Sequence, residues 1–205
     1  PNIQNLVYGA HLKDNFFAVF ESMTEANLAH VVMLAETGII APDTAQALAR
    51  VLLNLEAAGP SAFPLDPARE ETYFNYEAKV IDVAGPEIGG AMHVARSRND
   101  LKVATDRMRS RVACLDILDA LAAVRETAIA RAQTYADVVM PGYTHMQPAQ
   151  PTTFGYFVLG FAKALERDYQ RISDSYKRIN LNPLGSCAFA GTSFPIDRQR
   201  TCELL

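Results

Sequence analysis

The sequence predicts an all-α fold in which an N-terminal helical domain is followed by part of a bundle of long helices. Apolar residues recur at the helical period over most of the chain, and Gly and Pro mark where the periodic segments end. Two late segments, 100–139 and 154–180, keep this period for about 40 and about 27 residues, longer than a compact domain of 205 residues needs. We therefore expect residues 1–98 to form the N-terminal domain and residues 99–205 to form the first part of the central bundle.

The N-terminal domain should contain three shorter helices. Gly38 is suited to cap the first, Pro42-Asp43 to open the second, and Gly59-Pro60 to stop it. Glycine and proline pairs at residues 85–90 interrupt the chain before the next helix. The expected helices cover residues 15–37, 42–58 and 70–84.

The two long segments carry apolar faces that one partner helix cannot cover. Residues 100–139 show two apolar rows, one through Cys114 and one through Leu115. Residues 154–180 carry a heptad seam, which favours near-parallel packing in a bundle. Other subunits are expected to complete this bundle. The seam consists of Val158, Ala162, Leu165, Tyr169, Ile172, Tyr176 and Ile179.

Composition excludes several classes of protein. A net charge of −4 gives no general attraction to nucleic acid or to an anionic membrane, and no apolar run approaches a membrane span. The three cysteines are widely spaced, as in a reduced protein of the cytoplasm, and no signal peptide is visible. The four histidines are scattered, so we expect neither a metal site nor a cofactor.

The most informative segment is 93–100, which reads His-Val-Ala-Arg-Ser-Arg-Asn-Asp. A guanidinium matches a carboxylate through two parallel hydrogen bonds, and the free N–H groups of a helix N-terminus also favour anions. Arg98, Asn99 and Ser97 are therefore candidate carboxylate-binding residues. The structural alternative is that Ser97 and Asp100 cap the helix and the arginines are solvated.

A second informative segment, Met140–Pro151, lies between the two long helices. Its three prolines exclude helix and make a stiff crossing that presents Thr144, His145 and Gln147. Polar residues on a stiff connection often serve function. A connector whose histidine caps a helix or satisfies a buried carbonyl is the alternative.

These two segments, together with Arg178–Ser186, resemble the argininosuccinate lyases of the fumarase/aspartase superfamily. The early helix around Asn27–Leu34 also resembles that family, and the motifs follow in the family's order. The resemblance implies elimination of an amine from an N-succinyl substrate with release of fumarate. It assigns carboxylate binding to Arg98 and Asn99, and the catalytic pocket around the succinyl group to Thr144 and His145. Donors preorganised around a carboxylate are what such a carbanion-like transition state needs.

The chain departs from this family at positions expected to line the amine side of the pocket. Tyr73 stands where the family often has histidine, and Asn27 where it often has a substrate-contacting serine. The resemblance makes both substrate-binding candidates, although Tyr73 could instead be packing on an amphipathic helix. Because of these departures, an aminodicarboxylate other than argininosuccinate stays open as the substrate.

The resemblance also implies a cytoplasmic homotetramer whose active sites draw residues from several subunits. The family's catalytic serine loop would lie beyond Leu205, so we expect the 205-residue chain to be inactive alone. Two alternatives are a crystallin-like structural homologue without catalysis and a helical scaffold that binds partner helices.

Overall fold

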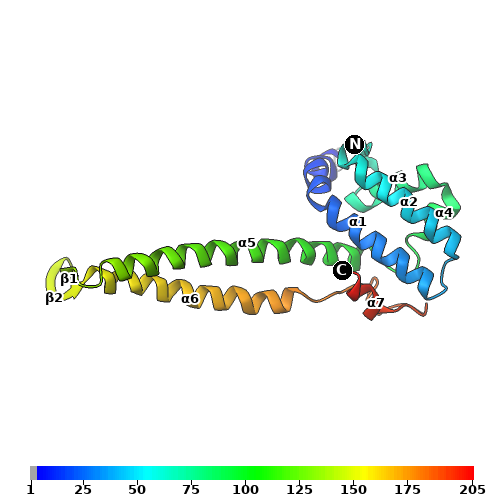
Figure 1. Cartoon of the computed structure of the whole chain (residues 1–205). Coiled ribbons are helices and arrows are strands. Elements are labelled where there is room, and N and C mark those ends of the chain that lie inside the picture. The colour runs from blue at the N-terminus through cyan, green and yellow to red at the C-terminus, as the bar shows by residue number, and fades with distance from the viewer. Residues whose placement is uncertain (1–3) are drawn as a thin grey trace. The chain divides into compact units, whose positions relative to one another are not determined.

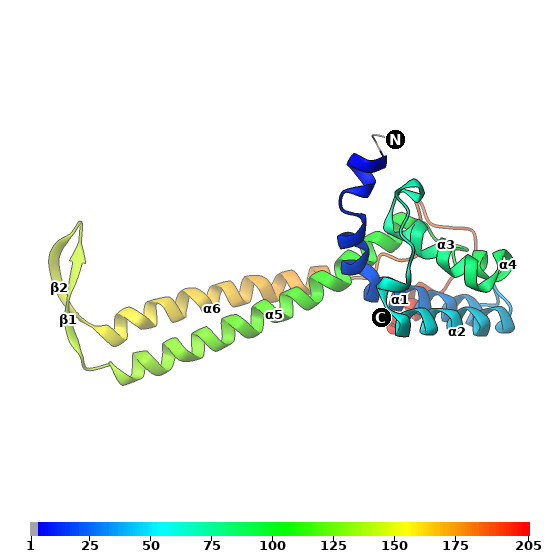
Figure 2. The same ribbon diagram turned by 90° about the horizontal axis from the view of Figure 1, so that it is seen from above.

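The computed structural model describes residues 4–205, whose backbone forms two compact units (Figures 1 and 2). The first unit contains the chain up to Arg109 together with Asn182–Leu205, and the second contains Ser110–Leu181. Apart from one two-stranded hairpin, the regular elements are helices, which confirms the predicted all-α class. The predicted domain boundary at residue 98 stays a prediction.

Six helices belong mainly to the first unit or begin in it, and they confirm the three helices predicted before residue 85. A π-helical turn at Gln4–Gly9 precedes them, and two short 3₁₀ turns, Pro60–Ala62 and Pro67–Arg69, connect α2 to α3. The helices are α1 (Leu12–Glu36), α2 (Pro42–Ala58), α3 (Thr72–Ala84), α4 (Pro86–Ala91), the start of α5 (Arg98–Thr134) and α7 (Arg198–Glu203).

The core of the first unit is an aromatic cluster between α1, the α2–α3 connection and α3. Phe16, Phe20, Phe63 and Tyr76 are buried, with ring centroids 5.0–6.4 Å apart. Aromatic rings at this spacing add to the free energy of simple apolar burial. The cluster fixes α1 against α3.

Helix α4 corrects the expectation that glycines and prolines only break the chain at residues 85–90. Pro86 occupies the first turn of α4, where its missing N–H costs nothing. A Cβ on Gly89 would lie 2.6 Å from the Cα atom of Ile81, so glycine is what lets α4 pack directly on α3. The glycine that reads as a helix breaker is here a close-packing position.

The second unit is an antiparallel pair formed by the rest of α5 and by α6 (Phe154–Ile179), joined through the hairpin (Figures 1 and 2). Of the seven residues in the predicted α6 seam, Tyr169 alone is exposed, at 38%. An ion pair links the two helices, with Arg125 Nη2 2.8 Å from Glu166 Oε1. None of the described helices is both long and apolar enough to cross a membrane.

Helix α5 ends at Thr134, five residues before the expected end at Val139. Tyr135 turns the chain, and its carbonyl accepts a hydrogen bond from the N–H of Gly155 at 2.9 Å. Gly155 is required there, because a Cβ would lie 2.4 Å from the carbonyl oxygen of Ala132. The expectation of helix up to Val139 was wrong because this tertiary contact competes with the apolar period.

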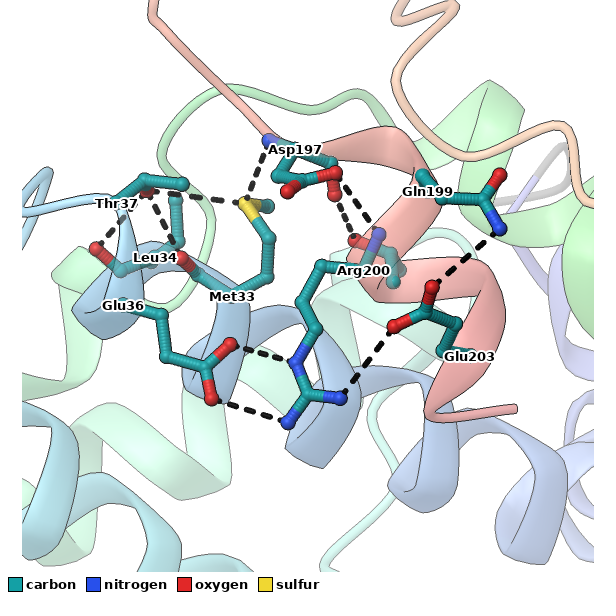
Figure 3. A network of polar contacts seen from close by, with 9 residues as sticks. Met33, Leu34, Glu36, Thr37, Asp197, Gln199, Arg200 and Glu203 are labelled. Atoms are coloured by element: carbon teal, nitrogen blue, oxygen red, sulfur yellow. Dashed lines mark hydrogen bonds and ion pairs between the residues drawn. The ribbon is translucent and has the colours of Figure 1, made fainter.

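The last helix, α7, is tied to α1 by a polar network (Figure 3). Arg200 donates from Nε and Nη2 to the two carboxylate oxygens of Glu36, at 2.7 and 3.0 Å. Asp197 caps α7 by accepting from the N–H of Arg200 at 2.9 Å, and its own N–H points to the sulfur of Met33 at 3.4 Å. Arg200 lowers the pKa of Glu36 through these hydrogen bonds.

Candidate active site

The first turn of α5 is held by reciprocal capping. The side chain of Ser97 accepts a hydrogen bond from the N–H of Asn99 at 3.2 Å, and Asp100 Oδ1 accepts from the N–H of Ser97 at 3.0 Å. This is a capping box with Asp in place of Glu, which confirms the predicted capping pair. Ser97 uses its hydroxyl in the cap, so its predicted contact with substrate stays a prediction.

Asp100 also holds a second segment of the chain. Its Oδ2 accepts hydrogen bonds from the N–H groups of Gly185 at 3.1 Å and Cys187 at 2.9 Å, while Oδ1 accepts a further bond from Leu101 at 3.0 Å. Gly185 and Cys187 have φ values of 91° and 54°, which turn their N–H groups toward one acceptor. With the Ser97 bond, the carboxylate receives four N–H donors at 2% exposure. The helix start and the loop at residues 184–187 are therefore fixed to each other.

Arg98, at the first position of α5, faces a cavity of about 400 Å³. Its Nη1 lies 3.6 Å from Glu70 Oε2 and 3.5 Å from Glu71 Oε1, and its guanidinium lies 5.2 Å from the centre of the Phe74 ring. An arginine held between two carboxylates and an aromatic face is set in place while staying half-exposed. The other polar residues that line the cavity are Tyr8, Asn15, Thr72, Tyr73, Lys102, Thr105, Asp106 and Arg109.

The neighbouring arginine, Arg96, is buried at 8% exposure and does not line this cavity. Its Nη2 donates to Oδ1 of Asn27 at 2.5 Å, and its guanidinium lies 5.6 Å from the centre of the Tyr73 ring. Tyr73 donates its hydroxyl hydrogen to Glu77 at 3.0 Å, and burial raises its pKa far above the ordinary value. Tyr73 lines the cavity, whereas Asn27 is fully buried and supports Arg96. Contact of either residue with a substrate stays a prediction.

His30 is buried near Arg96 and is neutral at physiological pH. Its pKa is lowered to about 3, mainly by burial and in smaller part by the positive charge of Arg96. The neutral ring places Nε2 2.8 Å from the carbonyl oxygen of Val94, so Nε2–H donates there. This bond fixes the segment that leads into Arg96 and the helix start.

The other three predicted residues, Thr144, His145 and Gln147, belong to the second unit. Strand β1 (Val139–Thr144) pairs with β2 (Gln147–Thr153), and Thr144 lies opposite Gln147 in the register. The register therefore brings these two residues together on either side of the turn. All three are exposed, at the tip of the hairpin.

His145 and Met146 form the two-residue turn of this hairpin. Their φ values are 49° and 65°, both in the left-handed region, which is the pattern of a type I′ turn. That turn normally takes Asn-Gly, and residues with larger side chains adopt it at a cost of order 1 kcal/mol each. Strain of this kind is often retained where a side chain must be presented for function.

Among residues 4–205 no cluster of His, Cys, Asp and Glu could hold a metal ion.

Comparison with known proteins decides the family. A family model described as lyase matches residues 10–205, nearly the whole chain. The chain belongs to this lyase family. Argininosuccinate lyase 1 of Shouchella clausii is 39% identical over 98% of this chain and 40% of its own length. Argininosuccinate lyase of Haloarcula marismortui is 46% identical over 91% of this chain and 37% of its own length. This lyase chain thus spans about two fifths of the length of these curated relatives.

Solved structures agree with this assignment. EDDS lyase in complex with formate superposes with a TM-score of 0.83 at 34% identity, covering 98% of this lyase chain and 39% of that protein. A class II fumarase from Schistosoma mansoni has a TM-score of 0.76 at 17% identity, covering 92% of this chain and 43% of that one. The second likeness shows the common fold, which confirms the predicted fumarase/aspartase-type architecture.

Sequence reasoning missed several residues around Arg98. Glu70, Glu71 and Phe74 were not among the predicted site residues. Lys102 and Arg109 lie four and eleven residues after Arg98, close to one and three helical turns, and share its cavity, so this helical spacing was an available signal. No local signal marks Glu70 and Glu71 as neighbours of Arg98, because that proximity depends on how α3 packs.

Proposed function

We propose that this chain is part of an argininosuccinate lyase-like carbon–nitrogen lyase, which eliminates an amine from an N-succinyl substrate and releases fumarate. The observation that carries the proposal is the corner at the start of α5. There a capped helix N-terminus carries Arg98 and exposed Asn99, and Arg98 lines a cavity large enough for a small substrate. The argininosuccinate lyases at 39–46% identity support the same activity.

The proposed chemistry needs negative charge to be stabilised on a carboxylate. A base removes the proton from the carbon next to that carboxylate, and the electrons delocalise into its oxygens. They then return to form the carbon–carbon double bond while the C–N bond breaks, and the nitrogen leaves after taking up a proton. Arg98 and Asn99 would bind a substrate carboxylate, because their donors sit at a helix end that already favours anions.

Thr144 and His145 are proposed to complete the pocket around the succinyl group, with Gln147 beside them. The hairpin places these residues close together and leaves them exposed, and exposure is needed for side chains that donate to a bound ligand. We propose that in the assembled protein they face the Arg98 corner of another subunit in a homotetramer. Exposed apolar side chains along α5 and α6 support such assembly, among them Val112, Leu115, Ile117, Val124, Phe157 and Phe161.

The test is the ultraviolet appearance of fumarate when the complete gene product is given argininosuccinate. The Arg98→Lys variant should lose at least roughly tenfold in kcat/KM, because lysine cannot make the paired hydrogen bonds of a guanidinium. Arg50→Lys, on the exposed face of α2, is the matched control and should keep the parent rate. His145→Asn should lose turnover without losing the fold.

Absence of fumarate with the parent protein would contradict argininosuccinate as the substrate. A panel of other aminodicarboxylates then distinguishes the remaining candidates, and the likeness to EDDS lyase makes its substrate the first to try. Absence of fumarate with every substrate of the panel would favour the crystallin-like structural homologue. Equal rates for the Arg98→Lys and Arg50→Lys variants would remove Arg98 from the site.

A further inference from the structure

The cavity beside α5 carries a balanced set of charges, which is unusual for a pocket that binds a dicarboxylate. Three bases and three acids line it. Lys102 and Asp106 pair with each other at 2.7 Å, whereas Glu70 and Glu71 both face Arg98, so an anionic group bound at Arg98 would lie close to two acids. The lining therefore suits a ligand that carries a cation close to its carboxylates. The charged residues are Arg98, Lys102, Arg109, Glu70, Glu71 and Asp106.

Two of these acids flank the carboxylate-binding arginine without being locked to it. Glu70 and Glu71 lie 3.6 and 3.5 Å from Arg98 Nη1, and their side chains are 51% and 44% exposed. By contrast, the structural pair between Arg200 and Glu36 is bidentate at 2.7 and 3.0 Å. The longer contacts leave carboxylate oxygens of the acidic pair available to a ligand.

The backbone holds this acidic pair at the edge of the cavity. Glu70 has a φ of 64° in the left-handed region, directly after the 3₁₀ turn at Pro67–Arg69, and its N–H donates to the carbonyl of Pro67 at 3.1 Å. Glu71 then occupies the N-cap position of α3 and makes no side-chain capping bond. A non-glycine residue in this region is costly, so the conformation is maintained by its surroundings.

We propose that Glu70 and Glu71 are specificity-determining residues that bind the cationic amine portion of the substrate while Arg98 binds an adjacent carboxylate. This inference rests on the proposed carbon–nitrogen lyase activity and names how the pocket recognises the leaving amine. A hydroxydicarboxylate would place no cation against the acidic pair. The pair therefore selects amine-bearing substrates over hydroxyl-bearing ones of the same carbon skeleton.

The test compares two ligands that differ in one ammonium group, L-aspartate and succinate, by calorimetric titration of the complete gene product. In the Glu70→Gln/Glu71→Gln variant, aspartate should bind more weakly and succinate the same or more tightly. The ratio of the two dissociation constants should shift toward succinate by roughly fivefold, the size expected for two half-exposed charge pairs. The matched control is Asp82→Asn/Glu87→Gln, which removes two exposed charges from the same unit outside the cavity and should leave the ratio unchanged.

The opposite signs separate recognition from a structural role. If both ligands lose affinity in proportion, or if the ratio stays at its parent value, the inference is wrong. Fumarate release by the parent enzyme together with an unchanged ratio would overturn this inference alone. A shifted ratio in a protein that releases no fumarate would uphold amine binding by the acidic pair and overturn the proposed reaction.

Discussion

Replacing Asp100 with asparagine removes one acceptor oxygen from the point where the start of α5 meets the loop at residues 184–187. The carboxylate receives four backbone N–H donors, two on each oxygen. An amide has one oxygen and one NH₂ group, so in either orientation two backbone N–H groups face a donor in place of an acceptor. The side chain keeps its size but loses its negative charge, which the N-terminus of α5 also favours.

The expected cost follows from these bonds. A buried polar group left without a partner costs about 1–3 kcal/mol, and two such groups lower the free energy of unfolding by about 4 kcal/mol. For a protein of this size the melting temperature should fall by roughly 10 °C. Urea and thermal unfolding of Asp100→Asn measure this loss. Amide hydrogen exchange at Gly185 and Cys187 should also become faster.

Asp66→Asn is the control for this prediction. The Asp66 side chain accepts one exposed bond, from the N–H of Ala68 to Oδ1 at 2.9 Å, and an amide oxygen can accept the same bond. Its free energy of unfolding should change by less than about 0.5 kcal/mol. If the free energy of unfolding of Asp100→Asn lies within about 1 kcal/mol of that of the parent protein in the same unfolding fits, the four-donor arrangement does not hold the two segments together.

Three further changes test other parts of the structure. His30 has a pKa of about 3 in the folded protein against an ordinary 6.5, so the unfolded chain takes up a proton first as the pH falls. The free energy of unfolding should therefore decrease as the pH drops from 6.5 toward 3, by about 2 kcal/mol at pH 5. His30→Gln should flatten this dependence of unfolding on pH, and His11→Gln should not. Gly155→Ala should lose about 2 kcal/mol in urea unfolding because its Cβ meets backbone, whereas Gly160→Ala, with open space around it, should be neutral or stabilising. Arg200→Gln should make amide exchange in α7 faster and less sensitive to salt, and unchanged exchange would show that the ion pair to α1 is not what holds this helix.

Local sequence signals predicted the helices and their caps well. The pattern places α2 where Pro42 opens it and Gly59 ends it, and Gly59 has the positive φ that a glycine adopts at little cost. Ser97 and Asp100 were predicted to cap α5 from their spacing alone, and the two hydrogen bonds confirm this. These features depend on residues three or four positions apart, which a sequence displays directly.

Features that depend on tertiary contacts could not be predicted. In the sequence Gly89 indicates a helix break, and only the close approach of Ile81 shows that it is a packing position. The end of α5 likewise depends on a contact between Tyr135 and Gly155. Within the candidate site, the family resemblance singled out Arg98, but the residue pattern alone gave no physical reason to separate it from buried Arg96. The distinction comes from packing, which buries one guanidinium against Asn27 and leaves its neighbour facing the cavity.

The bond between Asp100 and Gly185 has a consequence for the order in which the chain matures during translation. The two residues are 85 positions apart, so Arg98 and Asn99 emerge from the ribosome well before their anchoring loop. At roughly 5–20 residues per second the delay is on the order of 4–17 s. During this interval Asp100 is already synthesised, but the two N–H groups that donate to its Oδ2 are not. The corner that we propose binds substrate is therefore among the last parts of the first unit to be completed, although Arg98 and Asn99 are synthesised well before the loop.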